Sequence, residues 1–216
     1  MFASKGKLVT SLKLWWSPPP VQYHQSTPPH PDSYHLRRLL IWAPRMMWKI
    51  NFHCPHCGVK ESLRSKGLYN HIQLVMDVKD YYYLVAEYMD CRACSGTFIS
   101  GDQRMLSQLA DGVRARFPVQ MTRKYACDES VIAVLRSCTL GNSPTALRNT
   151  LHELHSEEWL RRQLDYLSCC QRHRRGVMAL KLKPADFQKP TPFQPFPTSK
   201  WFLAAYVRDV WSDIWS

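Results

Sequence analysis

Two pairs of cysteines carry the chemistry that is most readily identified in this sequence. Cys54 and Cys57 are separated by two residues, and so are Cys91 and Cys94. A tight turn across two intervening residues lets both sulfur atoms of a pair point at one centre. Two such turns supply the four thiolates of a closed, tetrahedral zinc site. The sequence therefore predicts one structural Zn²⁺ ion bound by these four cysteines, with no open position for catalysis.

The expected compartment favours metal binding over disulfide formation. No continuous apolar stretch follows the lysines near the N-terminus, and no stretch approaches the roughly 20 apolar residues of a membrane span. We therefore expect a nuclear or cytoplasmic protein that is neither secreted nor inserted in a membrane, with its thiols reduced. His53, His56 and His71 are near enough in sequence to be substitute ligands, but surface or packing roles are the simpler interpretation.

The residues around the cysteines predict the strands of a zinc ribbon. Residues 46–52 alternate in polarity before the first pair, and residues 97–99 form a short strand after the second. Between the pairs, residues 72–78 and 81–89 are β-branched and aromatic and are separated by Lys79 and Asp80, which indicates a hairpin. That hairpin would return the chain across the 33 intervening residues, so that the two pairs meet.

After residue 100 the apolar period changes from two residues to about 3.6, which predicts a helical domain. Asp128, Ser143 and Ser156 each suit the N-cap of a helix, so we expect three short helices in a compact bundle. The apolar stripe of the third helix would consist of Trp159, Leu160, Leu164 and Leu167.

The connection between the first two of these helices predicts a helix-turn-helix. Gly141 suits the end of one helix and Pro144 the first turn of the next, with a short turn between them. An ordinary helical hairpin with a solvated face has the same spacing, and this alternative stays open. In the DNA-binding interpretation, the recognition helix would expose Thr145, Arg148, Asn149 and His152. Phosphate contacts would come from Arg123, Lys124, Arg161, Arg162, Arg172, Arg174 and Arg175.

The charge of the chain favours a polyanionic partner. The net charge is +12, and the positive residues flank the cysteine-rich segment. No glycine-rich loop that would cradle a phosphate is present, and the acidic residues lie mostly at helix starts or in turns. We therefore expect DNA as the partner, no small-molecule substrate and no enzymatic activity. His152 and His155 have the spacing of a metal pair, but no third ligand is evident.

Composition predicts five consecutive parts. They are a flexible Pro-rich tail over 1–37, a zinc ribbon over 38–100, a helical domain over 101–175, a Pro-rich linker over 176–199 and an amphipathic helix over 200–216. Trp15 and Trp16 could anchor the tail onto a neighbouring surface. The terminal Trp-rich helix has no evident partner in the sequence, so it is a candidate contact for another protein or the first element of a missing part.

Several longer stretches resemble a known family. They are residues 41–48, 80–91, 97–100, 124–128, 140–143 and 155–159, with weaker similarity at 201–203 and 206–212. The resemblance covers about residues 38–175 and is to a domain-of-unknown-function family found in uncharacterised, transposon-derived animal proteins. It implies the zinc-bearing front part of a transposase-like protein. Longer members continue into a region that looks RNase-H-like, before which this chain stops, so no nuclease or transposase activity carries over.

Taken together, these patterns predict an α+β fold, in which a zinc ribbon precedes a small helix-turn-helix bundle. The predicted function is a zinc-stabilised, non-catalytic, DNA-binding module. Two alternatives stay open. One is a zinc-scaffolded protein-interaction module, whose Pro-rich segments would be ligands for aromatic grooves. The other is a truncated transposon relic without selected activity.

Overall fold

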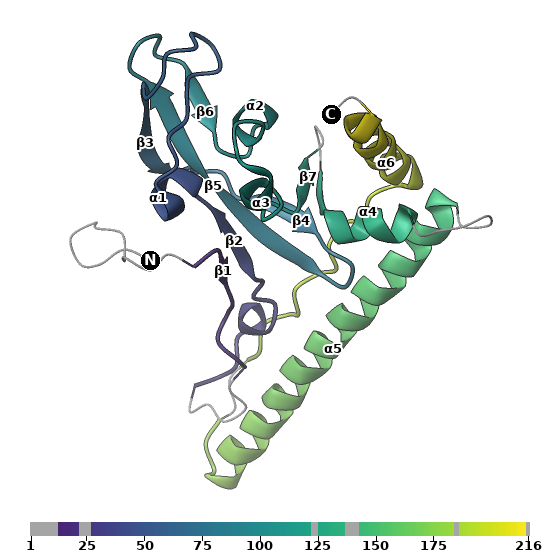
Figure 1. Ribbon diagram of the computed structural model, residues 1–216. Coiled ribbons are helices and arrows are strands. Elements are labelled where there is room, and N and C mark those ends of the chain that lie inside the picture. The colour runs from purple at the N-terminus through teal and green to yellow at the C-terminus, as the bar shows by residue number, and fades with distance from the viewer. Residues whose placement is uncertain (1–12, 22–26, 122–124, 137–142, 184–185, 215–216) are drawn as a thin grey trace. The chain divides into compact units, whose positions relative to one another are not determined.

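The computed structural model describes residues 13–21, 27–121, 125–136, 143–183 and 186–214, with the backbone alone at 135, 136 and 208–214. The fold is α+β, as predicted, with a curled sheet and helices (Figure 1). The chain forms two compact units, each assembled from segments that are distant in sequence. Unit 1 consists of Met1–Ser17, Arg38–Val75 and Tyr82–Ala126, and unit 2 of Pro18–Arg37, Met76–Tyr81 and Cys127–Ser216. The predicted parts, by contrast, were consecutive stretches.

The sheet, most of which belongs to unit 1, is organised around one long strand. Its strands are β1 (Trp15–Trp16), β2 (Leu39–Trp42), β3 (Leu63–Leu68), β4 (Gln73–Met76), β5 (Tyr81–Cys91), β6 (Thr97–Ile99), β7 (Val119–Met121) and β8 (Ala126–Asp128). The main order is β1-β2-β5-β4-β8-β7, and β3 and β6 also pair with β5. The first half of β5 runs parallel to β2, and its second half runs antiparallel to β3 and β6 (Figure 1). β5 therefore changes partners halfway along its length.

Both faces of the sheet are buried, which explains why β5 is apolar almost throughout. On one face Leu40, Trp42 and Leu84 join the main core of unit 1. The short helices α2 (Gln103–Leu106) and α3 (Asp111–Arg114) follow β6, and Met105 and Leu106 of α2 belong to this core. On the other face Ile41, Ala43 and Val85 pack against Met46, Met47 and Leu68. Burial of apolar surface on two faces stabilises the unit independently of any metal.

The predicted strand over residues 46–52 is wrong, because the chain forms the helix α1 (Pro44–Trp48) instead. Pro44 occupies the first turn of α1, where a missing N–H has no cost. The buried Glu87 of β5 accepts hydrogen bonds from the backbone N–H groups of Arg45 (3.1 Å) and Met46 (3.4 Å), and burial raises its pKa. A tertiary contact thus caps a helix that its own sequence does not cap. The predicted strands at 72–78, 81–89 and 97–99 correspond to β4, β5 and β6.

The helices of unit 2 differ from the predicted bundle. They are η1 (Pro31–Tyr34), α4 (Glu129–Arg136), α5 (Pro144–Ala179) and α6 (Ser199–Ile214). Ser143 caps α5 as predicted, since its Oγ accepts a hydrogen bond from Ala146 N at 3.2 Å. The predicted start of a third helix at Ser156 is wrong, because α5 continues through it for 36 residues. The turn containing Gly141 lies outside the described residues, and no helix-turn-helix is confirmed.

A Pro-rich segment packs along α5, where composition predicted a flexible linker. We call residues 186–198 the strap; it runs antiparallel to α5 (Figure 1). Its carbonyl oxygens accept hydrogen bonds from α5 side chains: Gln188 O from Tyr166 (2.7 Å), Thr191 O from Trp159 (3.0 Å) and Pro197 O from Arg148 (3.2 Å). Extended, Pro-rich backbone lacks internal hydrogen bonds, so these donors give it the partners that a helix or sheet would otherwise supply.

Other segments without helical or strand periodicity are also anchored by aromatic side chains. In unit 1, Trp15 contacts Tyr82 edge-to-face with ring centroids 4.9 Å apart. In unit 2, Tyr34 of η1 packs on Tyr166 of α5 with centroids 5.5 Å apart. The terminal helix α6 buries Phe202, so it has a partner within its own unit. None of the described helices combines the length and the apolar character that crossing a membrane requires.

Candidate metal centre

The four cysteines of the predicted zinc site come together in unit 1. Their sulfur atoms all lie within 4.8 Å of one another. Cys54 Sγ is 3.6 Å from Cys94 Sγ, and Cys57 Sγ is 3.7 Å from Cys91 Sγ. Around a tetrahedral Zn²⁺ with Zn–S bonds of about 2.3 Å, neighbouring sulfurs are about 3.8 Å apart. The sulfur positions therefore fit a tetrahedral metal ion.

Strand pairing brings the two cysteine pairs together. Cys91 is the last residue of β5, and Leu63 at the start of β3 lies opposite it in the antiparallel ladder. The chain therefore enters β3 beside the end of β5, and the turn that holds Cys54 and Cys57 lies just before this point. Cys94 lies in the turn that joins β5 to β6. The adjoining strands belong to a sheet of eight strands, so a self-contained ribbon is not confirmed.

The two cysteine turns have the same backbone geometry. In the first, Gly58 N donates to Cys54 O (2.9 Å) and His56 N donates to Cys54 Sγ (3.4 Å). In the second, Ser95 N donates to Cys91 O (3.0 Å) and Ala93 N donates to Cys91 Sγ (3.4 Å). We call these turns the two knuckles.

The two knuckles also share a closing backbone hydrogen bond and a left-handed residue. Cys54 N donates to Val59 O (3.2 Å), and Cys91 N donates to Gly96 O (2.8 Å). The residue after the second cysteine is left-handed in both, with φ of 70° at Gly58 and 57° at Ser95. Backbone N–H groups directed at sulfur stabilise the thiolate, which is the form that binds a metal.

The environment of Cys91 also favours its thiolate. Ser62 Oγ lies 3.3 Å from Cys91 Sγ, and this contact, together with the backbone N–H groups of Cys94 and Ala93, lowers the pKa of the Cys91 thiol to about 6. Beside it, Asp90 accepts hydrogen bonds from Nε and Nη2 of Arg64, each at 2.7 Å, which lowers the pKa of the Asp90 carboxyl to about 2. Neither Ser62 nor Asp90 was identified from the sequence. The knuckle spacing locates the ligands, but it does not indicate which strand partners surround them.

The nearby histidines do not belong to the cluster. Among the described residues, the group with metal-ligand geometry consists of the four cysteines alone. His53 and His56 are exposed, and His71 packs edge-to-face near Tyr69 with centroids 6.4 Å apart. Cys54 and Cys91 are buried, whereas Cys57 is exposed, so the site lies at the edge of the core.

The predicted recognition residues of the helical region have two different environments. Thr145 and Asn149 are exposed on α5. Arg148 donates to Pro197 O of the strap and lies over the Phe196 ring, and His152 packs edge-to-face against Phe196 with centroids 5.2 Å apart. The strap thus occupies the side of α5 from which these two residues were predicted to read bases. The predicted phosphate contacts Arg123 and Lys124 lie outside the described residues.

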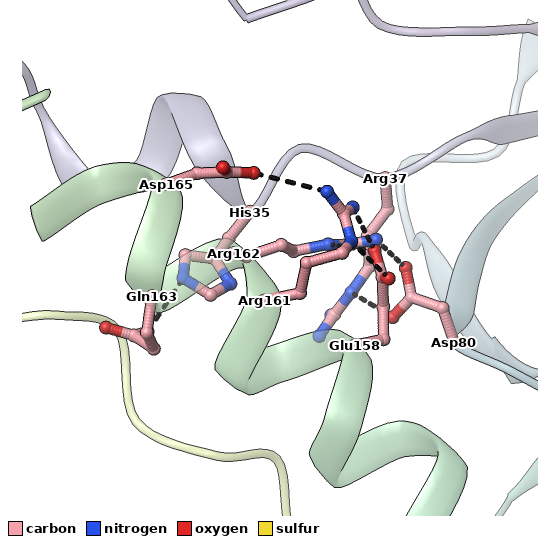
Figure 2. Close-up of polar contacts among 8 residues, drawn as sticks. All are labelled: His35, Arg37, Asp80, Glu158, Arg161, Arg162, Gln163 and Asp165. Atoms are coloured by element: carbon pink, nitrogen blue, oxygen red, sulfur yellow. Dashed lines mark hydrogen bonds and ion pairs between the residues drawn. The ribbon is translucent and has the colours of Figure 1, made fainter. Parts of the chain in front are cut away.

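Arg161 and Arg162 are paired with carboxylates of unit 2, as Figure 2 shows. Arg162 pairs with Asp80 and, at 2.8 Å, with Glu158, while Arg161 pairs with Glu158 at 2.7 Å and Asp165 at 3.2 Å. The Arg161 contact is the largest cause that lowers the pKa of Glu158. Arg162 is also largely buried, so these two arginines connect α5 to the residue 76–81 turn and to their own helix.

The remaining predicted phosphate contacts lie near the end of α5. Arg172, Arg174 and Arg175 are exposed there, and Lys181 and Lys183 follow them. His155, by contrast, is buried, with Nε2 2.8 Å from Asp77 O, and packs against Phe196 as His152 does, so both of these histidines have packing roles.

Comparison with known proteins provides one match. No curated protein and no solved structure matches the chain. A family described as a domain of unknown function (DUF6729) matches residues 1–211. The chain therefore belongs to this domain-of-unknown-function family.

Proposed function

We propose that the four cysteines bind one structural Zn²⁺ ion, and that the protein is a zinc-stabilised, non-catalytic DNA-binding module. The observation that carries the metal proposal is the pair of matching knuckles, whose four sulfurs lie within 4.8 Å of one another. Four thiolates favour zinc, or iron of the same geometry, over harder ions. They also complete the coordination shell, which leaves no position at which a substrate would be activated.

Metal analysis tests this part of the proposal. Native mass spectrometry of the purified chain should show one zinc per molecule, and the protein should be colourless, since an iron–thiolate centre absorbs visible light. Cys54→Ser should lose the metal, whereas His56→Ala, in the same knuckle but outside the ligand set, should retain it. A folded wild-type chain that binds no zinc when zinc is supplied would refute the zinc proposal.

Charge distribution supports the DNA-binding part. The net charge is +12, and Arg172, Arg174 and Arg175 form an exposed basic cluster on a regular helix. Arg148 and His152 are engaged by the strap, so the contacts would be made to phosphates more than to base edges. Binding should then depend weakly on sequence and steeply on salt. A nuclear location would follow from this function.

A gel-shift or anisotropy series at several salt concentrations tests DNA binding. The double variant Arg172→Ala/Arg174→Ala should reduce the slope of log K against log salt by about 2, since each phosphate contact contributes roughly 0.9. The matched control is Lys60→Ala/Arg114→Ala, which removes the same charge from exposed positions of unit 1. No binding to any duplex at low salt, with zinc bound and the fold intact, would exclude the proposal.

The origin of the module is a separate part of the proposal. The resemblance to transposon-derived proteins supports descent from the front part of a transposase-like protein, and a relic without selected activity is its alternative. The transcript downstream of residue 216 distinguishes a module of a transposase-like protein from a relic. An acidic RNase-H-like region there would place the module in an integrase-type enzyme.

A further inference from the structure

A row of leucines on α5 is exposed to solvent. Leu160, Leu164 and Leu167 are 53%, 65% and 50% exposed. Their spacing of four and three residues places them on one face of the helix. The sequence predicted that these side chains would be buried in a helical bundle, but the structure leaves them uncovered. We call this set the leucine face.

The leucine face is a second apolar face of α5. The first consists of Leu147, Leu151, Tyr166 and Cys169, all buried within unit 2. At 100° per residue, these positions point away from Leu160, Leu164 and Leu167. A helix with one apolar face needs one packing partner, whereas α5 has two such faces, of which the strap and the core of unit 2 cover one.

The charges that flank the leucine face are arranged with opposite sign at its two ends. Glu153 and Glu157 precede the leucines on the same face, and Arg174 and Arg175 follow them. All four are exposed. Over the part of the chain that the structure describes, Glu153, Arg174 and Arg175 have no ion pair of their own.

The charges of one α5 helix are complementary to those of a second, antiparallel copy of α5. Leu164 lies eleven residues after Glu153 and eleven residues before Arg175. If two copies of α5 pack antiparallel with Leu164 opposite Leu164, each Glu153 comes opposite the Arg175 of the other copy. A parallel arrangement would place Glu153 against Glu153 and Arg175 against Arg175, which is unfavourable.

We propose that a second copy of this chain covers the leucine face, with the two α5 helices antiparallel about a twofold axis at Leu164. A twofold interface uses the same residues on both copies, so every favourable contact occurs twice. Leucines in the centre and charged pairs at both ends match the usual anatomy of such an interface, an apolar core with a polar rim. The inference goes beyond the proposed zinc and DNA functions and requires neither.

Light scattering after gel filtration, or sedimentation equilibrium, tests the proposal on the full chain. The chain has a mass of 25.3 kDa, and the wild type should sediment at twice this value. Leu164→Glu should raise the dimer dissociation constant at least about 100-fold, because each copy loses a central leucine and two carboxylates come together. The matched control Leu180→Glu changes a leucine that is 72% exposed just beyond α5 and should remain dimeric.

The antiparallel orientation has its own test. Glu153→Arg and Arg175→Glu should each weaken the dimer about tenfold, and the combined variant should restore it, because the pair is re-formed with reversed sign. Circular dichroism and zinc content of each variant confirm that it is folded. A wild type that stays monomeric at about 100 μM, or a Leu164→Glu variant that stays dimeric, would overturn the proposal. A combined variant as weak as the single ones would overturn the antiparallel register.

Discussion

The knuckles of unit 1 and the α5–strap assembly of unit 2 are specified by the sequence in opposite ways. Each knuckle is defined within six residues, by two cysteines and a backbone turn that a metal ion would require. The α5–strap assembly depends on contacts between residues 22 to 49 positions apart, none of which follows a fixed spacing. A site set by coordination chemistry is therefore visible in a single sequence, whereas a packing arrangement is not.

Loss of a knuckle ligand should have the largest effect. Cys54→Ser removes one of four ligands, and structural zinc contributes a free energy of the order of 10 kcal/mol to folding. We expect unit 1 to lose metal and stability while the helical far-ultraviolet signal of α5 persists. Thermal unfolding followed by fluorescence and circular dichroism measures both. Melting of α5 together with the knuckles would contradict this expectation.

The strap should be sensitive to its aromatic anchor. Tyr166 is 1% exposed, and Tyr166→Ala should destabilise unit 2 by about 3–5 kcal/mol through the cavity that it leaves. Tyr166→Phe keeps the ring but removes the hydroxyl with its hydrogen bonds to Gln188 O and Cys170, and should cost about 1 kcal/mol. Denaturant unfolding gives both values, and limited proteolysis reports release of the strap. Zinc content should be unchanged in both variants, because Tyr166 belongs to unit 2 and the four cysteines to unit 1. Loss of metal would contradict this expectation.

Unit 2 should lose stability in mild acid. Burial lowers the pKa of His155 below 6.5, although the Asp77 carbonyl and the carboxylates of Asp77 and Asp80 oppose this and Arg37 adds to it. Above pH 6.5 the imidazole is neutral in both states and its contribution is fully present. As the pH falls below 6.5, the unfolded chain takes up the proton first, so the free energy of unfolding decreases by up to about 1.4 kcal/mol per pH unit. The decrease ends at the pKa of the folded state.

Urea unfolding between pH 5.0 and 7.5 in the presence of zinc measures this dependence. His155→Phe should be less stable at pH 7.5, because Asp77 O loses its donor, but its stability should vary less with pH. His35 remains in this variant, and burial also lowers its pKa, so some pH dependence should persist. An unchanged slope in His155→Phe would show that His155 is not the responsible group.

The smallest expected effect comes from two substitutions that compare the two knuckles with each other. Gly58 and Ser95 occupy the same left-handed position, which costs a residue with a Cβ roughly 1 kcal/mol. Ser95→Gly should therefore stabilise its knuckle by about 1 kcal/mol, and Gly58→Ser should cost a similar amount. A Cβ at Gly58 would meet nothing within 4 Å, so only the backbone conformation is tested. Stabilities that move in the same direction in both variants would contradict the equivalence of the knuckles.

The sequence alone predicts the α+β class, the four clustered cysteines, the strands β4, β5 and β6 and the cap at Ser143. These features depend on local spacing or on alternation over a few residues. It does not predict α1, because the cap of that helix comes from Glu87, 42 residues away from Arg45. It does not predict the continuity of α5 either. Ser156 is compatible both with a helix start and with a helix interior, and no proline or glycine between residues 145 and 175 ends the helix.

The packing of the strap on α5, where a flexible linker was predicted, was missed for a related reason. Proline-rich composition indicates that a segment forms no ladder or helix of its own, but it does not show whether the segment is mobile. Phe193 and Phe196 within the strap, and Phe187 near its start, are the signal that could have corrected this interpretation, since such residues usually find an apolar partner. Phe187 packs against the small core of unit 2 around Tyr34 and Tyr166, and the other two pack on α5.

The hydrogen bonds of the strap also constrain how its length can change in evolution. From Gln188 to Pro197 an extended chain advances about 28 Å at 3.1 Å per residue, and from Arg148 to Tyr166 the helix advances about 27 Å at 1.5 Å per residue. The two segments therefore run alongside each other over the same length, and the contacted carbonyls, of Gln188, Thr191 and Pro197, are three and six residues apart. Extended Pro-rich backbone completes one turn in three residues, so this spacing brings each of these carbonyls to the same side of the strap. Deleting three strap residues would keep that side facing α5, whereas deleting one or two would turn it away. Relatives should therefore vary in this segment by multiples of three residues.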